Sequence, residues 1–248
     1  MTKRYDEIYR ITFPVIVSQT GSNGLLTPAG LSDFLQEAAA RHADQLGWGF
    51  TEMHRNNRAW FLRNLRFRYL KAPLWGVDVV VETWPVKPSG LVYQREFRVY
   101  DSGDKELASG SSGWLLVNLE NKRPVMMDPQ QVQGIHFRDE SLFDPPFPSI
   151  SQVTDVTDMM EVMAGYGMLD LNRHVNHVHY IRWITEIMLR KEALPELPFE
   201  ANIKFQQEML AGQEGRVEMS ASEPGRYLIH VLRMPDNKEV LRAVISRL

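Results

Sequence analysis

The strongest constraint on the fold of this chain is one pattern of residues that occurs twice. In each half, a long stretch with apolar residues at helical spacing precedes four shorter stretches that are typical of β-strands. The helical stretches are residues 28–46 and about 176–191. The strand-like stretches are 60–69, 77–84, 91–100 and 113–119 in the first half, and 201–208, 215–221, 226–233 and 239–246 in the second. This order predicts two α+β units, each with one helix and an antiparallel sheet.

Sliding the chain along itself without gaps supports the duplication. The turns before the two helices then superimpose, with Gly21 on Asp170, Asn23 on Asn172 and Leu25 on His174. Only the second copy therefore carries an acid and an imidazole. Matching the strands requires a shorter connection between helix and strand in the second half, and it sets Glu208 opposite Leu70.

The turn before the second helix is the candidate active site. Asp170, Asn172 and His174 occupy alternate positions, and alternate side chains of a short extended or turn segment point the same way. The helix that follows places unpaired N–H groups and a partial positive charge beside them, starting at Asn176. Glu208, expected at a strand end, is a candidate fourth group.

Simpler explanations exist for the same residues. Asp170 and Asn172 are also suited to capping the helix or building an Asx turn. His174, His177 and His179 suggest zinc, but no acid or cysteine accompanies them at a spacing typical of a zinc site. We therefore expect neither a metal nor a cofactor.

Composition narrows the function classes. The 248 residues have a formal net charge of −3, which gives no electrostatic reason to expect nucleic acid or an anionic membrane as partner. The chain has no cysteine, so it has neither disulfides nor a thiol nucleophile. The N-terminal residues lack a signal-peptide core, and no apolar stretch approaches membrane-spanning length. A cytoplasmic protein is expected.

The motif around the candidate site resembles the signature of acyl-acyl carrier protein thioesterases. The matching residues are Asp170, Asn172, His174, Val175, Asn176, Tyr180 and Trp183. The first half is also similar to that family, in 35–47 and 73–84 and in 114–118, so the resemblance is nearly full length. It implies a tandem (double) hotdog fold, in which each sheet wraps around a long helix.

The resemblance implies catalytic roles for Asp170, Asn172, His174 and Glu208 in hydrolysis of a fatty acyl thioester of acyl carrier protein. Plant members carry a cysteine directly after the strand acid, where this chain has Met209, so an acyl-cysteine route is excluded. Plant members also carry an N-terminal targeting segment that this chain lacks, which favours a bacterial-type enzyme. Asp170 and Glu208 both remain candidates for the base that activates water.

The expected organisation is an N-terminal hotdog (1–140), a Pro-rich linker (141–155) and a catalytic C-terminal hotdog (156–248). The first half is expected to bind the acyl chain, with Asn176 of the second half at the substrate. The candidate tunnel residues are Leu31, Phe34, Leu35 and Ala38, although ordinary core packing explains them equally. Hydrolysis of acyl-coenzyme A and non-catalytic sensing of acyl thioesters remain alternatives, and homodimer formation stays open.

Overall fold

Two long helices and a single large sheet make up the fold. The computed structural model describes residues 8–88, 90–133, 135, 137–191 and 196–248. The long helices are α1 (Pro28–Gln45) and α4 (His177–Arg190), and the short ones are α2 (Phe50–Arg55) and α3 (Pro129–Val132). The strands are β1 (Tyr9–Pro14), β2 (Arg58–Tyr69), β3 (Asp78–Pro85), β4 (Val92–Asp101), β5 (Glu106–Asn118), β6 (Asp158–Met163), β7 (Phe199–Phe205), β8 (Glu214–Glu223), β9 (Arg226–Arg233) and β10 (Lys238–Arg247).

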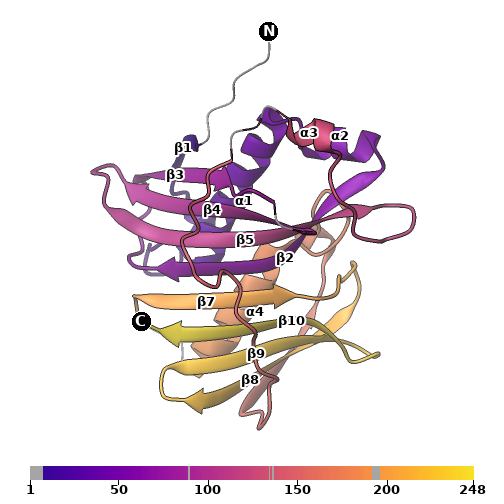
Figure 1. Cartoon of the computed structure of the whole chain (residues 1–248). Coiled ribbons are helices and arrows are strands. Elements are labelled where there is room, and N and C mark those ends of the chain that lie inside the picture. The colour runs from indigo at the N-terminus through magenta and orange to yellow at the C-terminus, as the bar shows by residue number, and fades with distance from the viewer. Residues whose placement is uncertain (1–7, 89, 134, 136, 192–195) are drawn as a thin grey trace.

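The strands form one antiparallel sheet in the order β1-β3-β4-β5-β2-β7-β10-β9-β8-β6. The two halves join where β2 pairs with β7, with Leu65 opposite Ile203. Figure 1 shows the first half above the second, with α1 and α4 behind the same face of the sheet. α1 contacts α4 directly. Each half is thus a helix packed against five strands, and the predicted tandem hotdog is confirmed.

Local sequence explains where both long helices begin. The Thr27 hydroxyl accepts a hydrogen bond from the Gly30 N–H at 3.0 Å, and the Asn176 side chain accepts one from the Val178 N–H at 3.1 Å. Both side chains satisfy an amide that has no partner within the helix. The apolar face of each helix then packs on the sheet, where Leu35 and Ile184 are both buried.

The internal repeat predicted from the sequence is visible in the backbone. β1, α1 and the turn between them correspond to β6, α4 and their turn at a constant offset of 149 positions, as Pro28 and His177 show. A short 3-10 helix precedes each turn, at Val17–Gln19 and Tyr166–Met168. The turns share a left-handed residue as well, Gly24 at φ 73° and Arg173 at φ 65°.

The strand register corrects the equivalence assigned to Glu208. Leu26 N–H donates to Pro73 O in the first half, and Val175 N–H donates to Met209 O in the second. These matched bonds make Glu208 the counterpart of Ala72, not of Leu70. They also show that the second half has the shorter connection. Pro28 and Pro73 are 45 positions apart, whereas His177 and Met209 are 32 apart.

Two expected strand boundaries need correction, and two strands are additional to those predicted. β7 ends at Phe205, not at 208, because the N–H groups of Gln206 and Gln207 both donate to Val240 O as the chain turns out of the sheet. β5 begins at Glu106, earlier than the predicted 113. The edge strands β1 and β6, of six residues each, were not predicted.

The Pro-rich segment between the halves crosses the face of the sheet opposite the helices (Figure 1). Side chains of the sheet hold its carbonyl groups: Arg66 donates to Pro145 O, Asn202 to Pro148 O and Arg242 to Ile150 O. Phe143 is buried beneath the guanidinium groups of Arg66 and Arg68, at 4.5 and 4.7 Å from its ring centre. The segment therefore covers the junction between the halves.

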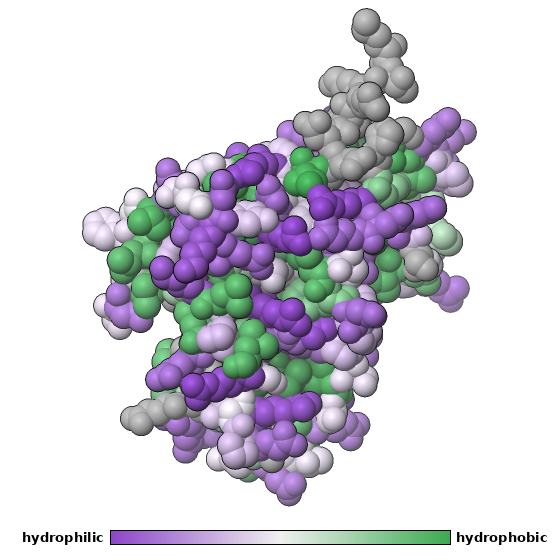
Figure 2. Space-filling view, turned by 60° about the vertical axis from the view of Figure 1, so that its left-hand side comes forward, coloured by the Kyte–Doolittle hydropathy of each residue, from purple (hydrophilic) through white to green (hydrophobic). Residues whose placement is uncertain are grey.

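The outer surface is mixed in character. Figure 2 shows hydrophilic residues over most of one face, with smaller apolar areas between them. Exposed large apolar side chains occur in matching loops of the two halves. They include Val17, Leu74 and Trp75 in the first half and Tyr166, Leu171 and Leu210 in the second. Among the described residues, none of the helices has the length and apolar character needed to cross a bilayer.

Candidate active site

The turn between β6 and α4 is stabilised by the side chain of its first residue. One oxygen of Asp170 accepts hydrogen bonds from the N–H groups of Asn172 and His174, at 2.8 and 3.1 Å. The Asp170 N–H donates in return to His174 O. Arg173 completes the turn with its left-handed backbone. Asp170 thus builds an Asx turn, and this turn presents the next two polar side chains.

Glu208 meets His174 at the other side of this turn. Glu208 Oε2 lies 2.9 Å from Nε2 of His174. The Glu208 backbone is held by Arg233, whose guanidinium donates to Glu208 O at 3.0 Å. Its neighbour Met209 is fully buried and accepts the hydrogen bond from the Val175 N–H. Residues from two distant segments therefore form a carboxylate–imidazole pair.

Two polar atoms near this pair are buried without a hydrogen-bond partner among the described residues. They are Oδ1 of Asn172 and the hydroxyl of Tyr180. Burial raises the pKa of Tyr180 above its ordinary value. Such atoms normally find a partner, and both residues line a cavity. The assignment of O and N in a carboxamide can be exchanged by rotation, so Asn172 offers this cavity either an acceptor or a donor.

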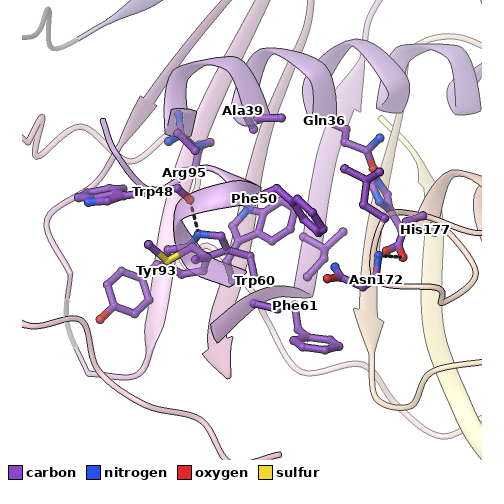
Figure 3. Close-up of a pocket in the computed structure, with 18 of the residues that line it drawn as sticks. Gln36, Ala39, Trp48, Phe50, Trp60, Phe61, Tyr93, Arg95, Asn172 and His177 are labelled. Carbon is purple, nitrogen blue, oxygen red and sulfur yellow. Dashed lines mark hydrogen bonds between the residues drawn. The ribbon is translucent and has the colours of Figure 1, made fainter. Parts of the chain in front are cut away.

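The cavity has a volume of about 540 Å³ and extends from the turn into the first half. In Figure 3, Asn172 and His177 lie at one end, Trp48, Tyr93 and Arg95 lie at the other, and Phe50 and Trp60 lie between them. All four catalytic candidates contribute to its wall, as does Asn176. Its remaining lining is largely apolar or aromatic, which suits an alkyl chain.

The catalytic candidates are thus brought together, whereas the four tunnel candidates are not among the lining residues. Leu31, Phe34, Leu35 and Ala38 are at most 4% exposed and belong to the hydrophobic core. α1 instead contributes an adjacent stripe, which consists of Gln36, Glu37, Ala39, Ala40 and Ala43. The small alanines leave space between this helix and the sheet.

Sequence reasoning did not identify the aromatic and cationic groups deep in the cavity. Trp60, Tyr93 and Arg95 lie in predicted strands and were given no role in the site, and Trp48 and Phe50 lie outside the predicted elements. The available signal was periodicity: Arg95 alternates with Tyr93 and Phe97 on the inward face of β4, and a cation there is unusual.

His177, which the sequence suggested as a possible metal ligand, and two arginines of β2 have local partners. His177 approaches Ser32 Oγ at 3.0 Å, and burial, followed by the nearby His179, lowers the pKa of His177 to about 4. Arg66 and Arg68 pair with Glu200. No group of three or more potential metal-binding residues occurs within the described part of the chain.

Comparison with known proteins identifies the family. The model of the acyl-ACP thioesterase N-terminal domain matches residues 6–135, and that of the C-terminal domain matches residues 152–245. The chain is 25% identical over 253 aligned residues to the palmitoyl-acyl carrier protein thioesterase of Cuphea hookeriana. The match covers 95% of this chain and 61% of the relative, so the chain spans less than two thirds of that relative's length.

Solved structures show the same fold. An acyl-ACP thioesterase from Bacteroides thetaiotaomicron superimposes with a TM-score of 0.84 at 22% identity, and the match covers 97% of both chains. The 12:0-ACP thioesterase from Umbellularia californica gives a TM-score of 0.85 at 22% identity, over 98% of this chain and 97% of the other. With two family domains matched in order and the tandem hotdog in place, this chain belongs to the acyl-ACP thioesterase family.

Proposed function

We propose that this protein hydrolyses fatty acyl thioesters of acyl carrier protein, releasing the fatty acid and the free thiol of the carrier. The observation that carries the proposal is the pairing of His174 with Glu208 at the mouth of a long, largely apolar cavity. Family membership supports the same chemistry. The pair supplies a base, and the cavity supplies a binding site for the alkyl chain.

Water activation requires a group that removes a proton as the oxygen attacks the carbonyl carbon. We assign this role to the Glu208–His174 pair acting as one unit, because their side chains are in hydrogen-bonding contact. The proton moves from water to the pair, the C–S bond then breaks, and the departing sulfur takes up the proton. Asp170 is a positioning residue, since one of its oxygens is already engaged by two backbone amides.

The carbonyl oxygen gains negative charge in the transition state and needs hydrogen-bond donors. The Asn172 carboxamide points into the cavity and is suited to this role (Figure 3). The His177 N–H is a second candidate, because Asn176 caps the N–H of Val178 and leaves the first amide of α4 without an acceptor among the described residues. A helix N-terminus favours negative charge.

The acyl chain lies in the cavity against the alanine stripe of α1. Ala39 and the aromatic side chains of Phe50 and Trp60 form its walls (Figure 3). This places the chain between α1 and β2 of the first half. The first half thus binds the chain, while the second half contributes the reacting groups.

The proposal is tested by measuring free-thiol release from one acyl group offered on acyl carrier protein and on coenzyme A. The wild-type protein is expected to hydrolyse the carrier-protein thioester more efficiently. Glu208→Gln should lower kcat by about 10²–10⁴-fold, the usual contribution of a general base. Glu186→Gln, on the exposed side of α4, is the matched control.

Three results would change the assignment. Equal or faster hydrolysis of the coenzyme A thioester would make this an acyl-coenzyme A hydrolase. Tight acyl-thioester binding without any thiol release would make it a sensor. Full activity of Glu208→Gln, with Glu186→Gln also active, would remove Glu208 from the mechanism.

A further inference from the structure

The loop that follows β7 carries Glu208 and lies outside the sheet. β7 ends at Phe205, and the next two N–H groups converge on one carbonyl oxygen, that of Val240 in β10, at 2.7 and 3.1 Å. The Glu208 side chain is 43% exposed, and among the described residues its one polar contact is with His174. The distance between the two side chains therefore depends on how the main chain of this loop (206–210, the Glu208 loop) is held.

Arg233 holds the main chain at Glu208 itself. Its Nη1 donates to Glu208 O at 3.0 Å, while Nε and Nη2 donate to the two oxygens of Asp236 at 3.2 and 2.6 Å. A guanidinium is planar, so a bidentate contact with a carboxylate fixes the direction of its remaining donor. The Arg233 side chain is 18% exposed and does not belong to the cavity wall. Its route to the reacting groups therefore runs through Glu208.

The Arg233–Asp236 pair belongs to the hairpin of β9 and β10. Arg233 is the last residue of β9, and Asp236 lies in the turn before β10. The hydrogen bonds from Arg233 lower the pKa of Asp236 to about 2, so the carboxyl group is charged at neutral pH. The Met234 N–H ties the hairpin to β8 by donating to Glu214 O at 2.9 Å. The guanidinium is thus anchored to the sheet, and it connects this anchor to the Glu208 loop.

The first half has no arginine at the matching position. Leu107 O accepts the two N–H groups that follow β2, just as Val240 O accepts the two that follow β7. Counting from these matched carbonyl groups through the strand pairs makes Asp101 of β4 the counterpart of Arg233. Asp101 accepts hydrogen bonds from amides of its own turn. Of the two halves, the one with arginine at this position is therefore the one that carries the catalytic acid.

We propose that Arg233, fixed by Asp236, is a positioning residue that holds the Glu208 carboxylate against His174 through the main chain. The proposal rests on the hydrolase function proposed above and extends its site to a residue outside the cavity. Without this hydrogen bond the Glu208 loop still forms, because its other main-chain hydrogen bonds remain. The carboxylate then spends less time in contact with the imidazole, so fewer bound substrates meet an assembled base.

The test measures kcat and KM for one acyl-carrier-protein thioester in the wild type, Arg233→Met and Arg66→Met. Methionine keeps an unbranched side chain and removes the donors. Arg66 is the matched control, because it is 13% exposed, pairs with Glu200 and donates to a main-chain oxygen, that of Pro145, away from the cavity. Thermal unfolding of each variant reports whether it is folded and how much stability it has lost.

The kcat of Arg233→Met should fall about 10–100-fold, since misplacing a reacting group by about 1 Å can cost about 10²-fold. Its KM should stay at the wild-type value, because the acyl chain and the carrier bind elsewhere. Arg66→Met should keep the wild-type kcat, even with an equal loss of thermal stability. Wild-type kcat in folded Arg233→Met, or an equal loss of kcat in Arg66→Met, would overturn the proposal.

Combining Arg233→Met with Glu208→Gln tests whether Arg233 acts through Glu208. Substitutions that affect one functional unit are not additive, so the double variant should be no slower than Glu208→Gln alone. A purely structural role would lower kcat by the same factor in both backgrounds, and that result would overturn the proposal.

A second measurement needs no substrate. The hydrogen-bonded imidazole N–H of His174 should give a nitrogen-15 NMR signal, assigned by its absence in His174→Gln. We expect this signal in the wild type and in Arg66→Met, and its broadening or loss through faster exchange with water in Arg233→Met. An unchanged signal in Arg233→Met would overturn the proposal. Absence of thiol release by a wild-type protein that shows the expected signals would instead refute the hydrolase function.

Discussion

The two turn-and-helix segments of this protein have the same backbone and different chemistry. Both turns contain a left-handed residue, and both helices begin at a side-chain cap. Gly21 and Leu25 stand in the first half where Asp170 and His174 stand in the second. The comparison shows that the backbone of the turn forms without an imidazole, and that Asn23, which accepts a hydrogen bond from the Leu25 N–H, replaces Asp170 as the side chain that holds the first turn. The turn therefore accounts for Asp170 but not for the imidazole of His174.

The two long helices differ in side-chain size. Small side chains of α1 leave a cavity, whereas larger side chains at the matching positions of α4 fill the corresponding space. Ala39 and Ala40 of α1 line the cavity, whereas their counterparts in α4 are Met188 and Leu189. Met188 is 1% exposed and borders a hollow of only about 10 Å³. The first half also has a longer connection after its helix, which includes α2 and Phe50. Side-chain size and one insertion thus decide which half holds a cavity.

The largest effect is expected from exchanging the side-chain sizes of these two helices. Met188→Ala should lower the free energy of unfolding by about 2–5 kcal/mol, because it opens a cavity in a packed core. It should leave the acyl-length profile unchanged. Ala39→Met should reduce kcat/KM for long chains by roughly tenfold or more relative to short ones, since its side chain displaces several methylenes.

Urea unfolding and a series of acyl thioesters provide the two measurements. A changed length profile in Met188→Ala would show that the second half also holds substrate. An unchanged profile in folded Ala39→Met would move the acyl chain away from the alanine stripe.

A smaller effect is expected from acid. His42 and His177 are buried and neutral, with pKa values of about 3 and 4, below the ordinary 6.5. The unfolded chain therefore binds more protons than the folded one below pH 6.5. The contribution of these histidines to the free energy of unfolding is fully present above that pH. It falls as pH decreases towards 4, by about 1.4 kcal/mol per pH unit for each histidine.

Urea unfolding of the wild type, His42→Gln and His177→Gln at pH 7 and pH 5 measures this slope. Each substitution should remove roughly half of the part due to these histidines, one from each half. A slope that both variants leave unchanged would show that neither histidine is responsible.

The smallest effect concerns the left-handed positions of the two turns. A Cβ at Gly24 would contact nothing within 4 Å, so Gly24→Ala tests only its φ of 73°. It should lower the free energy of unfolding by about 1 kcal/mol. Arg173→Gly should change it by less, because relief of the left-handed backbone is offset by greater entropy of the unfolded chain.

Gly167→Ala is the matched control, since that position has equal space and no left-handed backbone. Equal losses in Gly24→Ala and Gly167→Ala, measured by urea unfolding, would show that backbone strain is not the cause.

Local signals in the sequence predicted much of this architecture. Thr27 and Asn176 cap the helices as their residue types suggest, and the alternation of Asp170, Asn172 and His174 indicated the turn. Register was harder to predict, because it depends on hydrogen bonds between distant strands. Glu208 was a candidate because it was expected at a strand end and because it matches the family's pattern, while its position beyond the end of β7 and its counterpart Ala72 emerged only from the structure.

The residues that line the cavity could not be predicted from the sequence, for a related reason. Leu31, Leu35 and Ala38 form one apolar stripe on α1, and Ala39 and Ala40 form the next. Periodicity identifies both as inward-facing without distinguishing packed from empty space. That distinction depends on how closely β2 and α2 approach the helix, which is a tertiary property. Arg95 was the lining residue that the sequence could have indicated, because it places a cation on the inward face of β4.

The pairing of β2 with β7 has a consequence for dividing this protein. Cutting the chain between its halves would turn a central strand of each fragment into a long, unpaired edge, which is a template for association with other chains. Neither fragment is therefore expected to be a stable monomer. Recombining halves from different relatives should succeed only where β2 and β7 keep their register. Their pairing joins the two halves, and it therefore sets the position of the catalytic turn relative to the cavity.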